Sequence, residues 1–176
     1  KEYTGYYVKC AADKIDVAME VISDIFQNSK FDAGEMEKER GPIKEELNMY
    51  MDHPPRRVAE IFETLMYGDQ PLGWDIGGTK DNIDNMKHAD LLEYFKNHYF
   101  AKNTVIAIAG NVGIDQTKKR LEKYFNNVRE NERIEPAVFK GTQGKPRLII
   151  EYKKSDQTHV NLGFLGYSRF HPKYAT

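Results

Sequence analysis

Three glutamates, Glu35, Glu39 and Glu46, form the most chemically suggestive pattern in the sequence. At 100° per residue, Glu39 and Glu46 differ by about 20° around a helix axis, and Glu35 lies about 20° to the other side. The three carboxylates would therefore share one helix face. Carboxylates so close together repel one another unless a cation or hydrogen-bond donors compensate them, and a divalent metal ion would do this well.

A solvated surface helix is the simpler interpretation of the same residues. Helices rich in Glu and Lys are commonly exposed, and Lys38, Arg40 and Lys44 lie near enough in sequence to balance the charge. The five histidines do not decide between the two interpretations, because no pair of them is spaced as H-x-x-E-H or H-E-x-x-H. Each histidine is expected to be a surface or capping residue, so the residue pattern alone leaves both interpretations open.

The acidic face requires a helix, and the sequence predicts one from about Ala33 to Met51. Pro42 lies inside this stretch. Proline removes the hydrogen bond to the carbonyl of Lys38, so we expect either a kink or two helices that meet there. The run Asp52-His53-Pro54-Pro55 predicts a firm end to the helix.

The remaining patterns predict more helices and several strands, hence an α+β fold with helices packed on one face of a mixed, mainly antiparallel sheet. Apolar residues recur at helical spacing in four other segments, which are Asp13 to Phe26, Arg56 to Tyr67, Lys87 to Phe100 and Ile114 to Phe125. β-branched and aromatic residues predict strands in Thr4 to Cys10, Asn103 to Gly110, Arg147 to Tyr152 and His159 to Tyr167.

Composition excludes several classes of protein. The chain has 176 residues, a net charge of −1 and a mean hydropathy of −0.70. No apolar run is long enough to span a membrane, and the charge gives no reason to expect nucleic acid or an anionic membrane surface as a partner. Cys10 is the single cysteine, which excludes an intrachain disulfide and a thiolate zinc cluster.

A series of short motifs keeps a fixed order along the chain. The predicted acidic helix contains EKERGPIKEEL from Glu37 to Leu47, and the motifs after it are Gly68-x-x-Pro71-Leu72-Gly73, Tyr99-x-x-x-Asn103 and Ala109-Gly110-Asn111. In this order they resemble the third-ligand segment, and the part that follows it, of the insulinase, pitrilysin and mitochondrial processing peptidase family. The resemblance covers about residues 1–125, and Gln157-x-His159-Val160 resembles the start of the family's second domain.

The resemblance implies an inverted zinc peptidase, in which an H-x-x-E-H segment supplies two histidine ligands and a glutamate base. Glu46 would then be the third zinc ligand, and Glu39 would support the site without binding the metal. The H-x-x-E-H segment is not in this sequence and is expected to precede Lys1. No catalytic residue is therefore expected within the chain itself.

The resemblance also implies a division of the chain and a function. Residues 1–129 would be the C-terminal portion of the first peptidase domain, 130–145 a linker, and 146–176 the start of a second, homologous domain. The chain would be a fragment of a zinc-dependent metalloendopeptidase that hydrolyses peptides or unfolded polypeptides, and inactive alone. The alternative is a non-catalytic binding or scaffold paralogue of the same fold that partners an active subunit. An unrelated helical interaction domain would require the order of the motifs to be a coincidence.

Cofactor and partners follow from the same resemblance. The intact protein would hold Zn²⁺, bind a peptide substrate, and contain the missing upstream segment and the second domain. A homodimer or a heterodimer is compatible with the family, and a cytoplasmic location is expected. We further hypothesise that residues 147–152 and 159–167 fold back and fill the sheet positions left by the missing upstream strands, because an open apolar edge invites aggregation.

Overall fold

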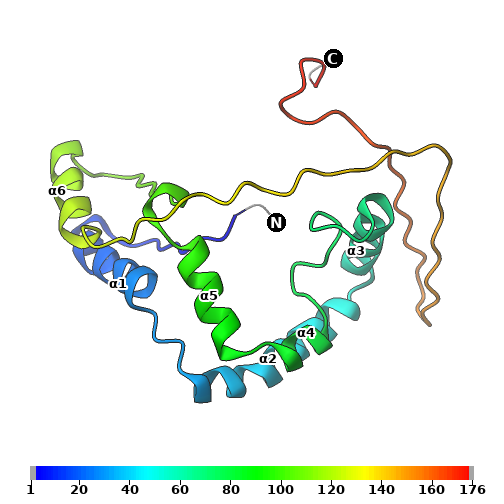
Figure 1. Ribbon diagram of the computed structural model, residues 1–176, viewed down its shortest axis with the longest axis horizontal. Helices are drawn as coiled ribbons and strands as arrows, with labels where there is room; N and C mark the ends of the chain where they lie inside the picture. The colour runs from blue at the N-terminus through cyan, green and yellow to red at the C-terminus, as the bar shows by residue number, and fades with distance from the viewer. Residues whose placement is uncertain (1–2, 175–176) are drawn as a thin grey trace. The chain divides into compact units, whose positions relative to one another are not determined.

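Helices are the regular secondary structure in residues 3–174, the part of the chain that the computed structural model describes (Figure 1). Contacts divide the chain into unit 1, Lys1–Lys38 with Met86–Pro136, and unit 2, Glu39–Asn85 with Ala137–Thr176. No described helix is both long and apolar enough to cross a membrane. The helices are α1 (Ile15–Asn28), α2 (Ala33–Met51), α3 (Pro54–Tyr67), α4 (Lys80–Asn85), α5 (His88–His98) and α6 (Ile114–Tyr124), with 3-10 turns η1 (Ala12–Lys14) and η2 (Ala101–Asn103).

The predicted α+β fold, with helices packed on one face of a mixed, mainly antiparallel sheet, is wrong for this structure. The residues that the structure describes are 47% helix and 0% strand. Within residues 3–174, no backbone hydrogen bond joins any two of the four predicted strand segments. A strand exists only when a neighbour about 4.8 Å away accepts and donates along its backbone, so β-branched and aromatic composition is not sufficient. The four segments therefore run as unpaired chain.

The predicted helices agree with the structure more closely, because helical hydrogen bonds close within one segment. Pro42 lies inside α2, which continues through it as one helix, so the alternative of two helices meeting is wrong. α3 begins at Pro54, and the ring Nδ1 of His53 accepts a hydrogen bond from the backbone N–H of Arg56 at 3.3 Å. The prediction that His53 is a capping residue is confirmed.

Unit 1 is built around the contact of α1 with α6. Arg120 donates two hydrogen bonds to the carboxylate of Asp16, each 3.0 Å long, and Gln27 donates to the backbone carbonyl of Tyr124 at 2.8 Å. The hydrogen bond from Arg120 holds the pKa of the Asp16 carboxyl below its usual value. These bonds fix the two helices side by side although about a hundred residues separate them in sequence.

Aromatic rings supply the small core of unit 1. The rings of Phe31 and Phe95 meet edge to face at 4.9 Å, and Tyr99 packs against Phe95 at the same centroid distance. The guanidinium carbon of Arg129 lies 4.4 Å from the centroid of Phe95. Phe100 is the one large side chain that is completely buried in the described part of the chain, so this core depends on few residues.

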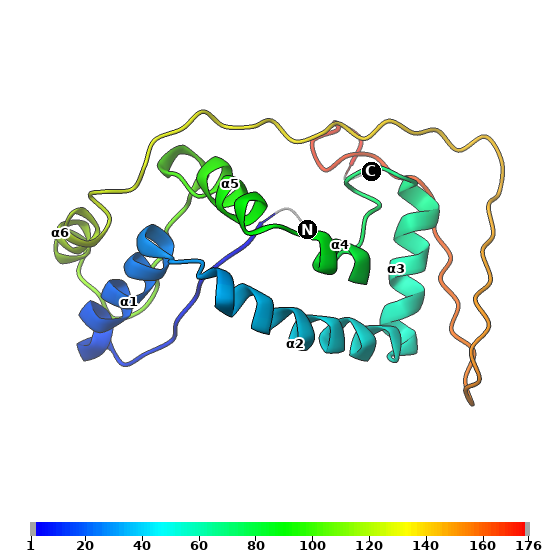
Figure 2. The same ribbon diagram turned by 60° about the horizontal axis from the view of Figure 1, so that its bottom comes forward.

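In unit 2, the segment at 147–153 lies along α3 (Figures 1 and 2). Arg57 on α3 donates to both carboxylate oxygens of Glu151, at 3.0 and 2.8 Å, and this donation lowers the pKa of the Glu151 carboxyl. Lys153 lies 2.7 Å from the carboxylate of Asp52, and Arg147 donates to the carbonyl of Met66 at 3.0 Å. The segment is thus held by α3 within unit 2, and the fold-back hypothesis receives no support from these contacts.

We expect Phe100→Ala to lower the free energy of unfolding by about 3–5 kcal/mol, the usual cost of truncating a buried phenylalanine. Urea unfolding followed by circular dichroism measures the change. Phe170→Ala is the matched control, because that side chain is 87% exposed and its truncation leaves no cavity. An equal loss in both variants would contradict the assignment of Phe100 to the core.

Candidate zinc-ligand site on helix α2

Helix α2 carries the three glutamates of the predicted acidic face, and all three are exposed. The helix starts where it does because the side chain of Asp32 accepts the backbone N–H of Glu35 at 3.0 Å. Glu35 also pairs with Lys38 at 2.6 Å. For Glu35, therefore, the simpler interpretation as part of a charge-balanced surface helix is confirmed.

Helix α4 and the turn before it cover one flank of α2. Lys44 pairs with Asp84 at 2.7 Å, and Arg40 donates to the backbone carbonyl of Ile83. Leu47 packs so closely on Gly77 that a Cβ there would lie 2.7 Å from its Cδ2 atom. At 100° per residue, Arg40, Lys44 and Leu47 lie about 100–160° around the axis from Glu46. The face that carries Glu46 is on a different side of the helix.

The carboxylate of Glu46 is oriented by its neighbour one turn later. The hydroxyl of Tyr50 donates a hydrogen bond to Glu46 Oε1. Among the residues that the structure describes, no lysine, arginine or histidine lies within ion-pair distance of this carboxylate. Glu46 therefore presents an exposed carboxylate in which one oxygen is engaged by a neutral donor.

This carboxylate fits zinc as one oxygen ligand, but no complete set of ligands lies around it. Residues 3–174 contain no group of three or more His, Cys, Asp and Glu side chains that could hold a metal ion. Three histidines are engaged elsewhere: His53 caps α3, His88 bonds the carbonyl of Phe31, and His98 bonds that of Tyr94. Glu39 is exposed on α2, and its predicted supporting role stays a prediction, as does the ligand role of Glu46.

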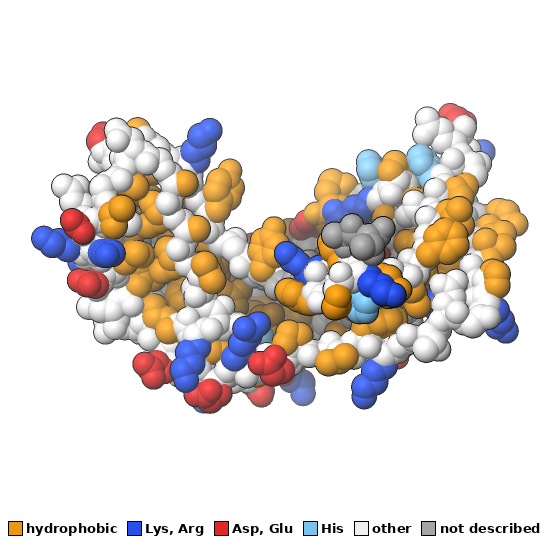
Figure 3. All heavy atoms as spheres, turned by 90° about the horizontal axis from the view of Figure 1, so that it is seen from above, with side chains coloured by type: hydrophobic (Ala, Val, Ile, Leu, Met, Phe, Trp, Pro, Cys, Tyr) orange, Lys and Arg blue, Asp and Glu red, His pale blue; other side chains and the backbone are white. Residues whose placement is uncertain are grey.

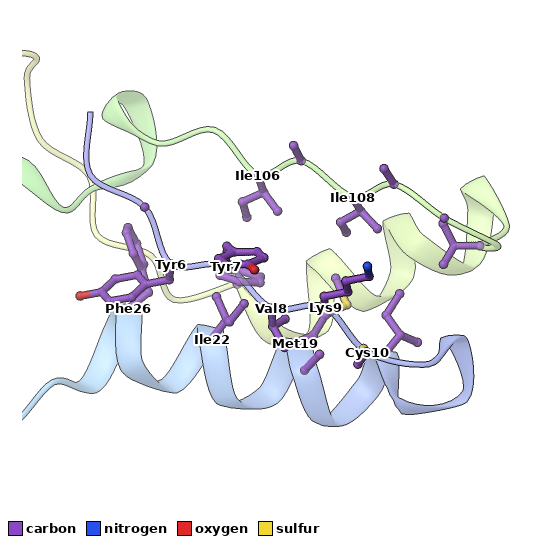
Figure 4. Close-up of a pocket in the computed structure, with 18 of the residues that line it drawn as sticks. Tyr6, Tyr7, Val8, Lys9, Cys10, Met19, Ile22, Phe26, Ile106 and Ile108 are labelled. Atoms are coloured by element: carbon purple, nitrogen blue, oxygen red, sulfur yellow. The ribbon is translucent and has the colours of Figure 1, made fainter. Parts of the chain in front are cut away.

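Unit 1 contains a cleft that sequence analysis did not find. It has a volume of about 590 Å³, and its walls are the segments at 4–12 and 104–112, above apolar side chains of α1. Figure 4 shows Ile106 and Ile108 pointing from one wall toward the other, with Met19 and Ile22 on the helix below. Among the described residues that line it, Lys9 alone is charged. The two segments that form this cleft are about a hundred residues apart in sequence. Their similar apolar composition was the one sequence feature that could have suggested that they lie together.

Much apolar surface is exposed around these unpaired segments. In the space-filling view, hydrophobic side chains are visible over much of the face shown (Figure 3). Val105 is 92% exposed, and Leu148 and Leu162 are 82% and 86% exposed. Exposed apolar surface of this extent is typical of regions that contact other polypeptide.

The comparisons with known proteins agree with the ordered motifs. Residues 1–80 match the family described as insulinase (peptidase family M16), and residues 85–176 match the family described as the peptidase M16 inactive domain. The chain belongs to the insulinase family, peptidase family M16. The predicted family is confirmed. The two matches meet between residues 80 and 85, while the division predicted at 130–145 stays a prediction.

The relatives with curated sequences are described as zinc proteases. The chain is 31% identical over 166 residues to the uncharacterized zinc protease YmxG of Bacillus subtilis, and 33% identical over 169 residues to one of Rickettsia bellii. The alignments cover 94% and 95% of this chain and 40% of each relative. The chain thus spans about two-fifths of the length of these insulinase-family relatives.

A solved structure shares the fold at low sequence identity. The periplasmic protease PqqL from Escherichia coli superposes with a TM-score of 0.63 and 18% identity, over 73% of this chain and 14% of that protein. The first half of PqqL matches equally well, over 28% of its length. This likeness shows that the fold of the described chain occurs within a larger protease.

Because no complete ligand set is present, we expect the isolated chain to bind zinc too weakly to stabilise it. A ligand whose concentration is far below its dissociation constant adds almost nothing to the stability of the folded state. The midpoint of thermal unfolding should therefore be the same with micromolar zinc as with a chelator, and the same in Glu46→Gln. A midpoint that rises with zinc and returns with chelator in the unsubstituted chain would contradict this.

Proposed function

We propose that this chain supplies the third zinc ligand, Glu46, of a zinc metalloendopeptidase that hydrolyses peptides or unfolded polypeptides. The observation that carries the proposal is the exposed Glu46 carboxylate, on a side of α2 different from the flank that α4 covers. The match to the insulinase family over nearly the whole chain and the zinc-protease relatives support it. The two histidine ligands and the general base would come from a segment outside this sequence.

The chemistry assigned to the chain's own residues is limited. Glu46 would donate one carboxylate oxygen to the metal, and Glu39, seven residues earlier on the same face, would hold neighbouring groups in place. When bound, zinc acidifies its water and polarises the scissile carbonyl. The chain alone should not hydrolyse peptides, because it contributes neither the base nor a complete coordination sphere.

The cleft in unit 1 suits an extended segment of polypeptide from outside this sequence. Its two walls present backbone N–H and C=O groups that make no backbone hydrogen bond to any described residue, at positions 4–10 and 105–109. Its floor is apolar. An extended strand satisfies both demands at once, because it offers backbone groups at its edges and apolar side chains toward α1. In this proposal the strand belongs to the same longer protein.

A non-catalytic scaffold paralogue is the second candidate. The description of the match at residues 85–176 as an inactive domain favours it. The absence of a complete metal-ligand group in residues 3–174 is compatible with both candidates. The sequence of the full-length protein discriminates between them, because an intact H-x-x-E-H supports the peptidase and its loss supports the scaffold.

In the full-length protein, we expect Glu46→Gln to lower chelator-sensitive cleavage of a quenched fluorescent peptide by about 100-fold or more, since even residues behind the ligands typically cost 10–100-fold. Glutamine keeps the size of the side chain and removes its charge. Glu35→Gln is the matched control, because this exposed glutamate of the same helix pairs with Lys38. Equal activity in Glu46→Gln and the unsubstituted protein would remove Glu46 from the coordination sphere.

A strand in the cleft should protect its walls from hydrogen exchange. We expect amides at 6–9 and 106–108 to exchange more slowly in the full-length protein than in this chain by about tenfold or more, the factor given by about 1.4 kcal/mol of opening free energy. Amides at 118–123 in α6 serve as the control, because they are already helical in this chain. Equally fast exchange of the wall amides in both proteins would show that no strand enters.

A further inference from the structure

Tyr50 connects Glu46 to the start of α3. Its hydroxyl donates to Glu46 Oε1, and the guanidinium carbon of Arg56 lies 3.1 Å from the centroid of its ring. Arg56 in turn donates from Nε to the carboxylate of Glu60 at 2.9 Å. All of these residues lie within unit 2. The carboxylate of Glu46 is thus the end of a continuous chain of contacts that crosses from α2 to α3.

The corner between the two helices holds this arrangement in place. The backbone N–H of Arg56 is bound by His53, which caps α3. The side chain of Glu60 is 19% exposed, and its hydrogen bond raises the pKa of Arg56, whose guanidinium is always charged. A cation over an aromatic face is attracted by the electrons of the ring. The ring of Tyr50 is therefore restrained from its α3 side, and its hydroxyl is left directed at Glu46.

A glutamate side chain on a helix surface samples several rotamers, and a metal ligand must adopt one. A hydrogen bond to one carboxylate oxygen selects the rotamers in which the other oxygen faces a fixed direction. Ligating carboxylates are themselves usually hydrogen-bonded, and loss of such a partner typically weakens metal binding. Tyr50 has the position and the donor needed for this purpose.

We propose that Tyr50 is a positioning residue for Glu46, and that it engages one carboxylate oxygen so that the other is presented to zinc. This inference rests on the proposed function, because it assumes that Glu46 is a ligand. It adds a role for Tyr50, which orients Glu46, and for Arg56, which restrains the ring of Tyr50. A purely structural role would be different: the hydroxyl would then tie one turn of α2 to the next and affect stability alone.

A double-mutant cycle in the full-length zinc protein tests the proposal. The variants are Tyr50→Phe, Glu46→Gln and the two together, and the measurement is the zinc dissociation constant from competition with a chelator. We expect Tyr50→Phe to weaken zinc binding by about 10–100-fold. The double variant should bind no more weakly than Glu46→Gln alone, because Tyr50 acts through Glu46. Tyr67→Phe is the matched control, since its ring packs against Phe139 at 5.3 Å, away from Glu46.

Two further readouts separate positioning from stability. The unfolding midpoint of the metal-free Tyr50→Phe protein should equal that of the unsubstituted protein, and the absorption spectrum of its cobalt-substituted form should change. Arg56→Gln should cause part of the same loss of zinc affinity and add nothing in combination with Tyr50→Phe. A lower metal-free midpoint with unchanged zinc affinity would overturn the positioning role.

The failure of this inference can be told apart from the failure of the proposed function. If Glu46→Gln binds zinc as tightly as the unsubstituted protein, Glu46 is not a ligand and both proposals are wrong. If Glu46→Gln weakens binding but Tyr50→Phe does not, Glu46 remains the ligand and the role of Tyr50 is wrong. If both weaken binding and their effects add fully, Tyr50 acts independently of Glu46, which also overturns the inference.

Discussion

The pairing of backbone polar groups is the constraint on which the rest of this structure depends. Every N–H and C=O that leaves water must find a partner, and a helix provides these partners within one segment while a strand does not. The described segments at 4–10 and 105–109 have no backbone partner, so they stay at the surface and their apolar side chains stay with them. The core of unit 1 is small for the same reason, with Phe100 as its one completely buried large side chain among the described residues.

Helix α2 shows how one element can serve two purposes. One flank is fixed by the ion pair of Lys44 with Asp84 on α4 and by close packing on the turn at Gly77. Such contacts position a helix without using its acidic face. Glu46 can therefore be held by a rigid backbone, as metal ligands generally require, while its side chain is restrained separately by Tyr50. Backbone position and side-chain orientation are set by different neighbours, which allows each to be tested alone.

Sequence patterns anticipated the helices because a helix is a local structure. The apolar residues of α1 and the proline-rich start of α3 are sufficient to place both elements within a few residues. The predicted sheet was wrong, because whether Thr4 to Cys10 forms a strand depends on pairing with distant chain rather than on its own composition. Glu46 was reached through an ordered set of motifs. Sequence analysis gave Tyr50 no role beside Glu46, since its bond to Glu46 and its contact with Arg56 depend on the corner between α2 and α3.

The cleft and the Glu46 carboxylate both present polar groups whose full set of partners is not found among the described residues. Among residues 3–174, the walls at 4–10 and 105–109 have no backbone partner, and no other group completes a metal site with the carboxylate. In a zinc protease built as proposed, polypeptide from outside this sequence would satisfy both. Metal binding and folding are coupled whenever the ligands come together only in the folded state.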